Sequence, residues 1–128
     1  MKLLLNHQID VLQKQFRIYD QTNLKDLKIV AKLFCLNSNY TWYLITQNPY
    51  NPDCLYAIVE GNYVEAGSVL LSDLKSLRYL AIPAVERDIH FRPCSVKSLW
   101  DRLNGITDQP ICVEPGEIDS ANFAAANL

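Results

Sequence analysis

The chain has 128 residues, of which 49% are apolar and 20% are charged, and its formal net charge is −2. This length suits one domain, and the apolar fraction is large enough for a buried core, which excludes wholesale disorder. The small net charge argues against a strongly basic nucleic-acid binder and against a strongly acidic DNA mimic. We expect one α+β domain at residues 1–104, followed by an irregular or partly disordered tail at 105–128.

The cysteines and the N-terminus indicate the compartment. The four cysteines, Cys35, Cys54, Cys94 and Cys112, include no Cys-x-x-Cys pair, so a zinc ribbon or thioredoxin motif is not supported. The apolar run at residues 3–5 is too short for a signal peptide or a membrane span. We therefore expect a cytoplasmic protein with reduced thiols, no bound cofactor and no membrane partner.

The first predicted element is a helix, because apolar residues at positions 5, 9, 12 and 16 follow one helical face. Asn6 is its expected N-cap, and the helix should end near Tyr19. Strands are expected where apolar, aromatic and β-branched residues gather between turn residues, at 27–36, 41–47, 54–60 and 63–71. Gly61-Asn62 predicts a hairpin turn, and Gly67 marks a bulge or a close approach.

The second half of the domain alternates between short elements. Ser72 is the expected cap of a short helix that ends near Tyr79, and residues 85–91 are predicted to form a strand. Ser95 then caps a second helix that ends at Gly105. This order predicts an α+β domain with a mainly antiparallel, four- to five-stranded meander sheet, an N-terminal helix and two short helices in the C-terminal half.

The polar segment at residues 85–91 is the best candidate site. Strand alternation places Glu86, Asp88 and His90 on one face, where two carboxylates and an imidazole could hold a metal ion or act as acid and base. A solvated edge strand explains the same charges without any activity. A third interpretation is that Arg87 or Asp88 forms an ion pair with Glu65 across the sheet.

Aromatic residues suggest a binding surface. Trp42 and Tyr43 are adjacent in a predicted strand, so their side chains point to opposite faces of the sheet. One of them is therefore a candidate surface anchor, unless both faces are covered. We take Trp42, Tyr43, Glu65 and Arg87 as the candidate binding residues.

Four stretches of the sequence together resemble a small bacterial family known as domain of unknown function 2958. They are residues 40–43 (YTWY), 65–67 (EAG), 71–74 (LSDL) and 86–93 (ERDIHFRP). The resemblance covers roughly residues 3–103, and its most specific part is the last stretch. The chain departs from the family pattern at 48–53 and at 55–57, where members carry an acidic loop and a Phe-Gly step. The resemblance implies a plasmid- or phage-borne accessory protein that is encoded near antirestriction and conjugation genes.

Three functions follow from these features. The leading hypothesis is a non-enzymatic accessory protein of a mobile element, which docks a protein partner through its sheet and the 86–91 strand, in host-defence evasion or element maintenance. The first alternative is a nucleic-acid accessory protein, with a basic patch formed by Arg17, Lys25, Lys28 and Lys32. The second is a metal-assisted hydrolase that uses Glu86, Asp88 and His90.

Overall fold

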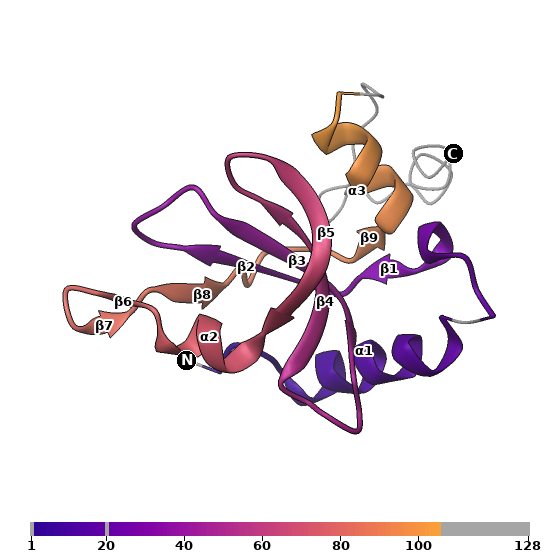
Figure 1. The fold of residues 1–128 in the computed structure, drawn as a ribbon, viewed down its shortest axis with the longest axis horizontal. Helices are drawn as coiled ribbons and strands as arrows, with labels where there is room; N and C mark the ends of the chain where they lie inside the picture. Colours follow the sequence, from indigo (N-terminus) through magenta and orange to yellow (C-terminus); the bar gives the residue numbers. More distant parts are fainter. Residues whose placement is uncertain (1, 20, 106–128) are drawn as a thin grey trace.

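The computed structural model describes residues 2–19 and 21–105 of the chain. This part contains three α-helices and a five-stranded antiparallel sheet, which confirms the predicted α+β class (Figure 1). The helical segments are α1 (Asn6–Ile18), the 3-10 turn η1 (Leu24–Asp26), α2 (Leu71–Ser76) and α3 (Val96–Leu103). The strands are β1 (Lys28–Ile29), β2 (Ala31–Cys35), β3 (Thr41–Gln47), β4 (Cys54–Glu60), β5 (Val64–Leu70), β6 (Arg78–Tyr79), β7 (Ile82–Pro83), β8 (Val85–Arg87) and β9 (Cys94–Ser95). The predicted tail lies outside the described residues from Ile106 onward.

The main sheet has the strand order β5-β4-β3-β2-β8. Strands β2 to β5 form a meander, because short turns rich in Asn, Pro and Gly join each strand to its neighbour. Strand β8 then pairs antiparallel with the outer side of β2. The sheet therefore has β5 at one edge and β8 at the other.

The predicted strand at residues 27–36 is divided into β1 and β2 at Val30. The N–H of Val30 donates to the carbonyl oxygen of Leu44 at 2.9 Å, and the chain enters the main sheet after Val30, as β2. Strand β1 instead pairs with β9, in a register that joins Lys28 to Ser95 and Ile29 to Cys94. This two-residue ladder brings together segments that are far apart in the sequence.

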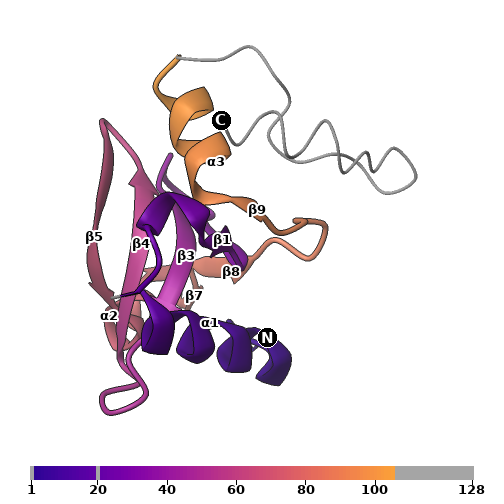
Figure 2. The ribbon, with the colours of Figure 1, turned by 90° about the vertical axis from the view of Figure 1, so that its right-hand side faces the viewer.

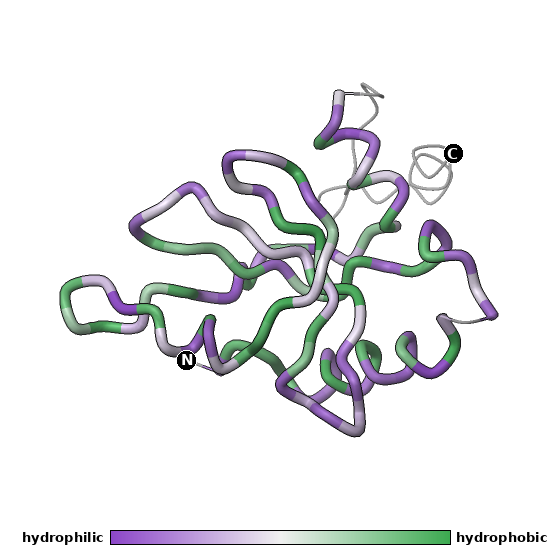
Figure 3. The backbone as a smooth tube through the Cα atoms, viewed as in Figure 1, coloured by the Kyte–Doolittle hydropathy of each residue, from purple (hydrophilic) through white to green (hydrophobic). Residues whose placement is uncertain are grey.

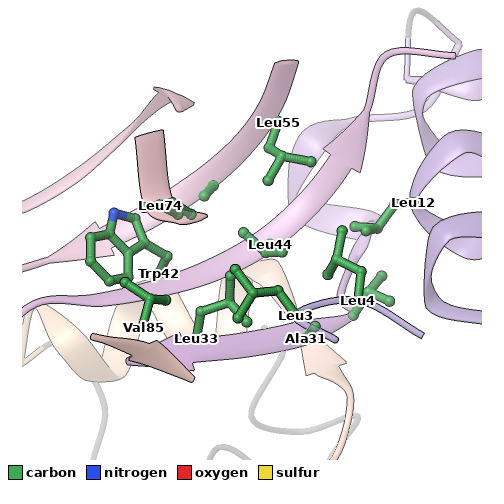
Figure 4. Close-up of a cluster of buried hydrophobic side chains, with 12 residues drawn as sticks. Leu3, Leu4, Leu12, Ala31, Leu33, Trp42, Leu44, Leu55, Leu74 and Val85 are labelled. Carbon is green, nitrogen blue, oxygen red and sulfur yellow. The ribbon is translucent and has the colours of Figure 1, made fainter. Parts of the chain in front are cut away.

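Both faces of the sheet are covered. We call the first face the one from which Trp42, Leu44 and Leu55 point, and it packs against α1, α2 and the N-terminal segment (Figure 4). The second face carries Tyr43 and Ile45, and it packs against α3, η1, β1 and β9. Helices α1 and α3 lie at the bottom and the top of the view in Figure 2.

A buried glutamine joins α1 to the sheet at a β-bulge. The register of β3 against β4 shifts between Leu44 and Thr46, so Ile45 has no partner in that ladder. The Nε2 of Gln15 donates to the carbonyl oxygens of Ile45 at 2.6 Å and of Lys28 at 3.0 Å. The Oε1 of Gln15 accepts from the N–H of Lys28 at 2.8 Å. One side chain thus satisfies backbone groups that the interrupted ladders leave unpaired.

Several local predictions are corrected or confirmed. The expected cap of α3 is confirmed, because the Oγ of Ser95 accepts from the N–H of Ser98 at 3.0 Å. The N-cap of α1 is Leu5 and not Asn6, and the N–H of Leu5 donates to the Oε1 of Gln8 at 2.9 Å. Gly67 makes neither a bulge nor a close approach, because the ladder of β4 with β5 is continuous and no atom lies within 4 Å of a Cβ placed there.

The predicted helix at 72–79 is shorter than expected. Helix α2 ends at Ser76, and the chain then turns back on itself as the hairpin of β6 and β7. None of the helices in the described ranges has the length and apolar composition needed to span a bilayer.

Candidate functional site

The segment at residues 85–91 is extended only as far as Arg87. The N–H of His90 donates to the Oδ1 of Asp88 at 2.9 Å, and the N–H of Phe91 donates to the Asp88 carbonyl oxygen at 3.3 Å. The carboxylate of Asp88 therefore stabilises a turn, as Asp side chains commonly do. The predicted strand is wrong beyond Arg87, and Glu86, Asp88 and His90 do not form a row on one face.

This turn also removes the basis for the metal-assisted hydrolase. The Oδ2 of Asp88 lies 3.7 Å from the Nζ of Lys32, so its charge is balanced by a lysine. Across residues 2–19 and 21–105, no three His, Cys, Asp or Glu side chains come together in a group that could hold a metal ion. The predicted metal site of Glu86, Asp88 and His90 is therefore wrong.

The expected ion pair between Glu65 and Arg87 or Asp88 is also wrong. Glu65 lies on β5 and Arg87 lies on β8, at opposite edges of the five-stranded sheet. Neighbouring strands are about 4.8 Å apart, so the two edges are separated by roughly 19 Å. The Nη1 of Arg87 instead donates to the carbonyl oxygen of Lys2.

Trp42 and Tyr43 point to opposite faces, as alternation predicts, but both are only 7% exposed. Neither is a surface anchor, because each face has its own cover of helices and strands. The Tyr43 hydroxyl donates to the Oε1 of Glu60 at 3.2 Å, and its ring lies 5.7 Å from the Nζ of Lys32 and 6.3 Å from the ring of Phe91. Both aromatic residues belong to the hydrophobic core.

The ERDIHFRP segment lines a groove against the N-terminal half of α1. The groove has a volume of about 410 Å³, and its walls include His7, Val11, Lys28, Arg87 and Ile89. Arg87 is half-buried, and among the described residues the ion pairs join only Lys32 to Asp88 and Lys97 to Asp101. The groove therefore combines apolar walls with Lys28 and Arg87, which form no ion pair with the described residues, and with Asp88, which is paired with Lys32.

The hairpin of β6 and β7 is a second candidate that sequence reasoning missed. We call residues 77–83 the apolar arm; it projects from the body of the protein, and its tip is apolar (Figures 1 and 3). Leu80 is 81% exposed and Ile82 is 51% exposed, while Leu77 and Tyr79 are about two-fifths exposed. Four large apolar side chains are thus held in water on one small hairpin, which is the kind of surface that marks an interaction site.

The turn of the apolar arm holds its backbone in an unfavourable conformation. Leu80 and Ala81 have φ angles of 52° and 71°, although neither is a glycine. For an L-residue with a Cβ, this left-handed conformation costs roughly 1–2 kcal/mol. Such turns favour Asn and Gly, so Leu80-Ala81 gives no turn signal in the sequence. Leu77 and Leu80 continue the helical spacing of Leu74, so the local pattern favours a longer helix over this hairpin.

The four cations of the proposed nucleic-acid patch have different surroundings. Lys28 lines the groove beside α1, whereas Lys25 lines a different cavity, beside Trp100 of α3. Lys32 is paired with Asp88, and Arg17 lies in the last turn of α1. The nucleic-acid alternative therefore stays a prediction, with Lys28 and the Lys32–Asp88 pair at the groove and Lys25 at another cavity.

The fold defines a small α+β protein whose antiparallel meander is covered on both faces and whose β8 edge carries the groove and the apolar arm. The chain belongs to the family described as protein of unknown function (DUF2958), whose family model matches residues 3–108. This confirms the resemblance seen in the sequence. Comparison with curated proteins gave no match, and comparison with solved structures gave none either.

Proposed function

We propose that this chain is a non-enzymatic accessory protein that binds a protein partner through the β8 edge of its sheet. The apolar arm is the anchor, and the observation that carries the proposal is the 81% exposure of Leu80 at the tip of a strained hairpin. An exposed leucine on a strained backbone adds no stability to an isolated monomer. Strained positions that are kept in a fold cluster at binding and functional sites.

The partner that fits this arm is a protein with an apolar pocket on its surface. Full burial of a leucine or isoleucine side chain contributes about 1.5–3 kcal/mol, so Leu80 and Ile82 together supply a large part of a micromolar affinity. The arm is a paired hairpin, so it loses less conformational freedom on binding than a flexible loop would. Arg78 contributes to its order, because its Nη1 donates to the carbonyl oxygens of Lys75 and Leu77.

The groove supplies the polar part of the same edge. Strand β8 runs from the base of the arm to Arg87, so the arm and the groove lie at its two ends. Arg87 and Lys28 would receive a carboxylate of the partner, because Arg pairs with carboxylates through two parallel hydrogen bonds. The family resemblance supports a role in a mobile genetic element, in host-defence evasion or in maintenance of the element.

Site-specific cross-linking tests this proposal. A photoreactive phenylalanine derivative is placed at position 80 and, as the control, at Tyr50, which is 89% exposed on the loop between β3 and β4. Both variants are expressed in cells of the organism that carries the gene. A protein that is cross-linked from position 80 and not from position 50 is identified and purified for direct binding measurements.

Direct binding then decides the role of the arm. Leu80→Asp is expected to weaken binding of the purified partner about 30-fold, the equivalent of roughly 2 kcal/mol of lost burial. Aspartate tolerates a positive φ better than leucine does, so the hairpin itself is preserved. Tyr50→Asp is the matched control and should change the affinity less than twofold. Equal cross-linking from both positions, or full affinity of Leu80→Asp, would contradict the proposal.

A further inference from the structure

The opposite edge of the sheet, formed by β5, has an open row of backbone groups. In the ladder with β4, the N–H of Gly61 donates to the carbonyl oxygen of Tyr63, and the N–H of Leu71 donates to that of Asp53. Hydrogen-bonded pairs alternate along an antiparallel ladder, so Glu65, Gly67 and Val69 direct their backbone groups toward β4. The N–H and C=O groups of Val64, Ala66 and Ser68 therefore point outward.

No part of the described chain covers this row. Strand β5 is the last strand of the sheet, and it lies at the outer left in Figure 2. The hydrogen bonds from elsewhere in residues 2–19 and 21–105 do not reach Val64, Ala66 or Ser68. The strand is seven residues long and has one charged residue, Glu65. It has no proline, no lysine and no bulge, which are the features that usually keep an edge strand from pairing.

We propose that a second copy of this chain pairs with β5 to form a symmetric dimer with one continuous sheet. The twofold axis lies at Ala66, so that Ala66 faces Ala66 of the second copy, and Val64 faces Ser68. This register joins outward groups to outward groups and forms about six hydrogen bonds between the copies. A twofold axis requires an identical surface on both copies, and an antiparallel strand pair meets that condition.

The side chains of β5 are self-complementary in this register. On the second face, the side chains that meet are Val64, Ala66 and Ser68, which are small and uncharged. On the first face, Glu65 lies opposite Gly67 of the second copy, where no atom lies within 4 Å of the position of a Cβ. The glutamate side chain therefore has room to lie across the strand, and the two Glu65 charges do not face each other directly.

The dimer is independent of the proposed partner site, because β5 and β8 are opposite edges of the sheet. An interface made by one strand is smaller than the standard size of about 1,200–2,000 Å², so we expect a dimer that dissociates on dilution. The β8 edge of each copy, which carries the proposed partner site, remains accessible in the dimer.

A charge exchange at the twofold axis tests the dimer. Ala66 is exposed, so we expect Ala66→Glu and Ala66→Lys to fold as monomers. Sedimentation velocity of the full chain, from low micromolar to high micromolar concentration, should show a dimer for the wild type and at least a tenfold weaker one for each variant alone. An equimolar mixture of the two variants should dimerise again, because opposite charges then meet across the axis.

Tyr50→Glu is the control for added charge, since Tyr50 is exposed on the loop between β3 and β4 and not on β5, and it should leave dimerisation unchanged. Thermal denaturation of both Ala66 variants checks that the monomer is folded. A wild type that stays monomeric throughout the concentration range overturns the proposal, and so does a dimer that persists in Ala66→Glu. If the mixture does not form the dimer again, the proposal is also overturned, because recovery is expected only when position 66 of one copy faces position 66 of the other.

Discussion

Replacement of Gln15 by leucine should cause one of the largest losses of stability available to a single polar substitution in this fold. Leucine has a similar volume, so the change removes hydrogen bonds without leaving a large cavity. Gln15 makes three hydrogen bonds, to the backbone of Ile45 and to both backbone groups of Lys28. At about 1 kcal/mol each, the free energy of unfolding should fall by about 3 kcal/mol.

Urea denaturation followed by tryptophan fluorescence measures this loss. A slope of about 1.5 kcal/mol per M converts 3 kcal/mol into a fall of about 2 M in the midpoint. The matched control is Gln13→Leu, two residues earlier on α1, because Gln13 makes one hydrogen bond, from its Nε2 to the Oε1 of Gln47 at 2.9 Å. Its expected loss is about 1 kcal/mol.

The difference between the two glutamines is the decisive quantity. If the midpoints of Gln15→Leu and Gln13→Leu agree within experimental error, Gln15 does not replace the missing ladder bonds at the bulge. A fall in the slope as well as the midpoint would show that the denatured or native state has changed in compactness, and the comparison would then rest on thermal denaturation.

Three further predictions concern local features. Replacing Leu80-Ala81 by Asn-Gly should raise the free energy of unfolding by about 1–2 kcal/mol, because Asn and Gly accept a positive φ. An unchanged urea midpoint would show that the turn at Leu80-Ala81 is not strained. Ser95→Ala should destabilise the protein by about 1 kcal/mol through loss of the α3 cap, whereas Ser98→Ala should be neutral or stabilising in the same assay, since the Ser98 hydroxyl is buried without a hydrogen-bond partner among the described residues. Asp88→Asn keeps the turn acceptor and should shift the melting temperature less than Asp88→Ala, and equal shifts would mean that the charge matters more than the turn.

The sequence was sufficient for elements that carry a local periodic signal. Helices α1 and α3 follow from apolar residues at helical spacing, and the meander from β2 to β5 follows from β-branched and aromatic runs separated by turn residues. A hairpin was also predicted at Gly61-Asn62, and one joins β4 to β5 there, but neither residue has a positive φ; a Cβ at Gly61 would instead lie 2.7 Å from the ring of Tyr40. The opposite orientation of Trp42 and Tyr43 was also predictable from strand alternation.

The candidate site was less predictable, because it depends on single side chains and on contacts between distant segments. The pattern from Val85 to Phe91 alternates like a strand, but the Asp88 side chain bonds to the backbone of His90 and ends the extended segment. Leu80-Ala81 forms a turn that its composition does not favour. The burial of both Trp42 and Tyr43 depends on helices that come from opposite ends of the domain, and no local pattern reports that arrangement.

The short ladder of β1 with β9 has a consequence for how the protein responds to cleavage. It ties residues 28–29 to residues 94–95, so the chain between them forms a closed loop that contains the whole main sheet. A cut on the C-terminal side of β8 would detach α3 and expose Tyr43, Ile45 and Ile58 together. The remaining piece would keep η1 and β1 but lose α3 and β9 from the cover of the second face, and truncation at that point should therefore yield an insoluble product instead of a smaller stable domain.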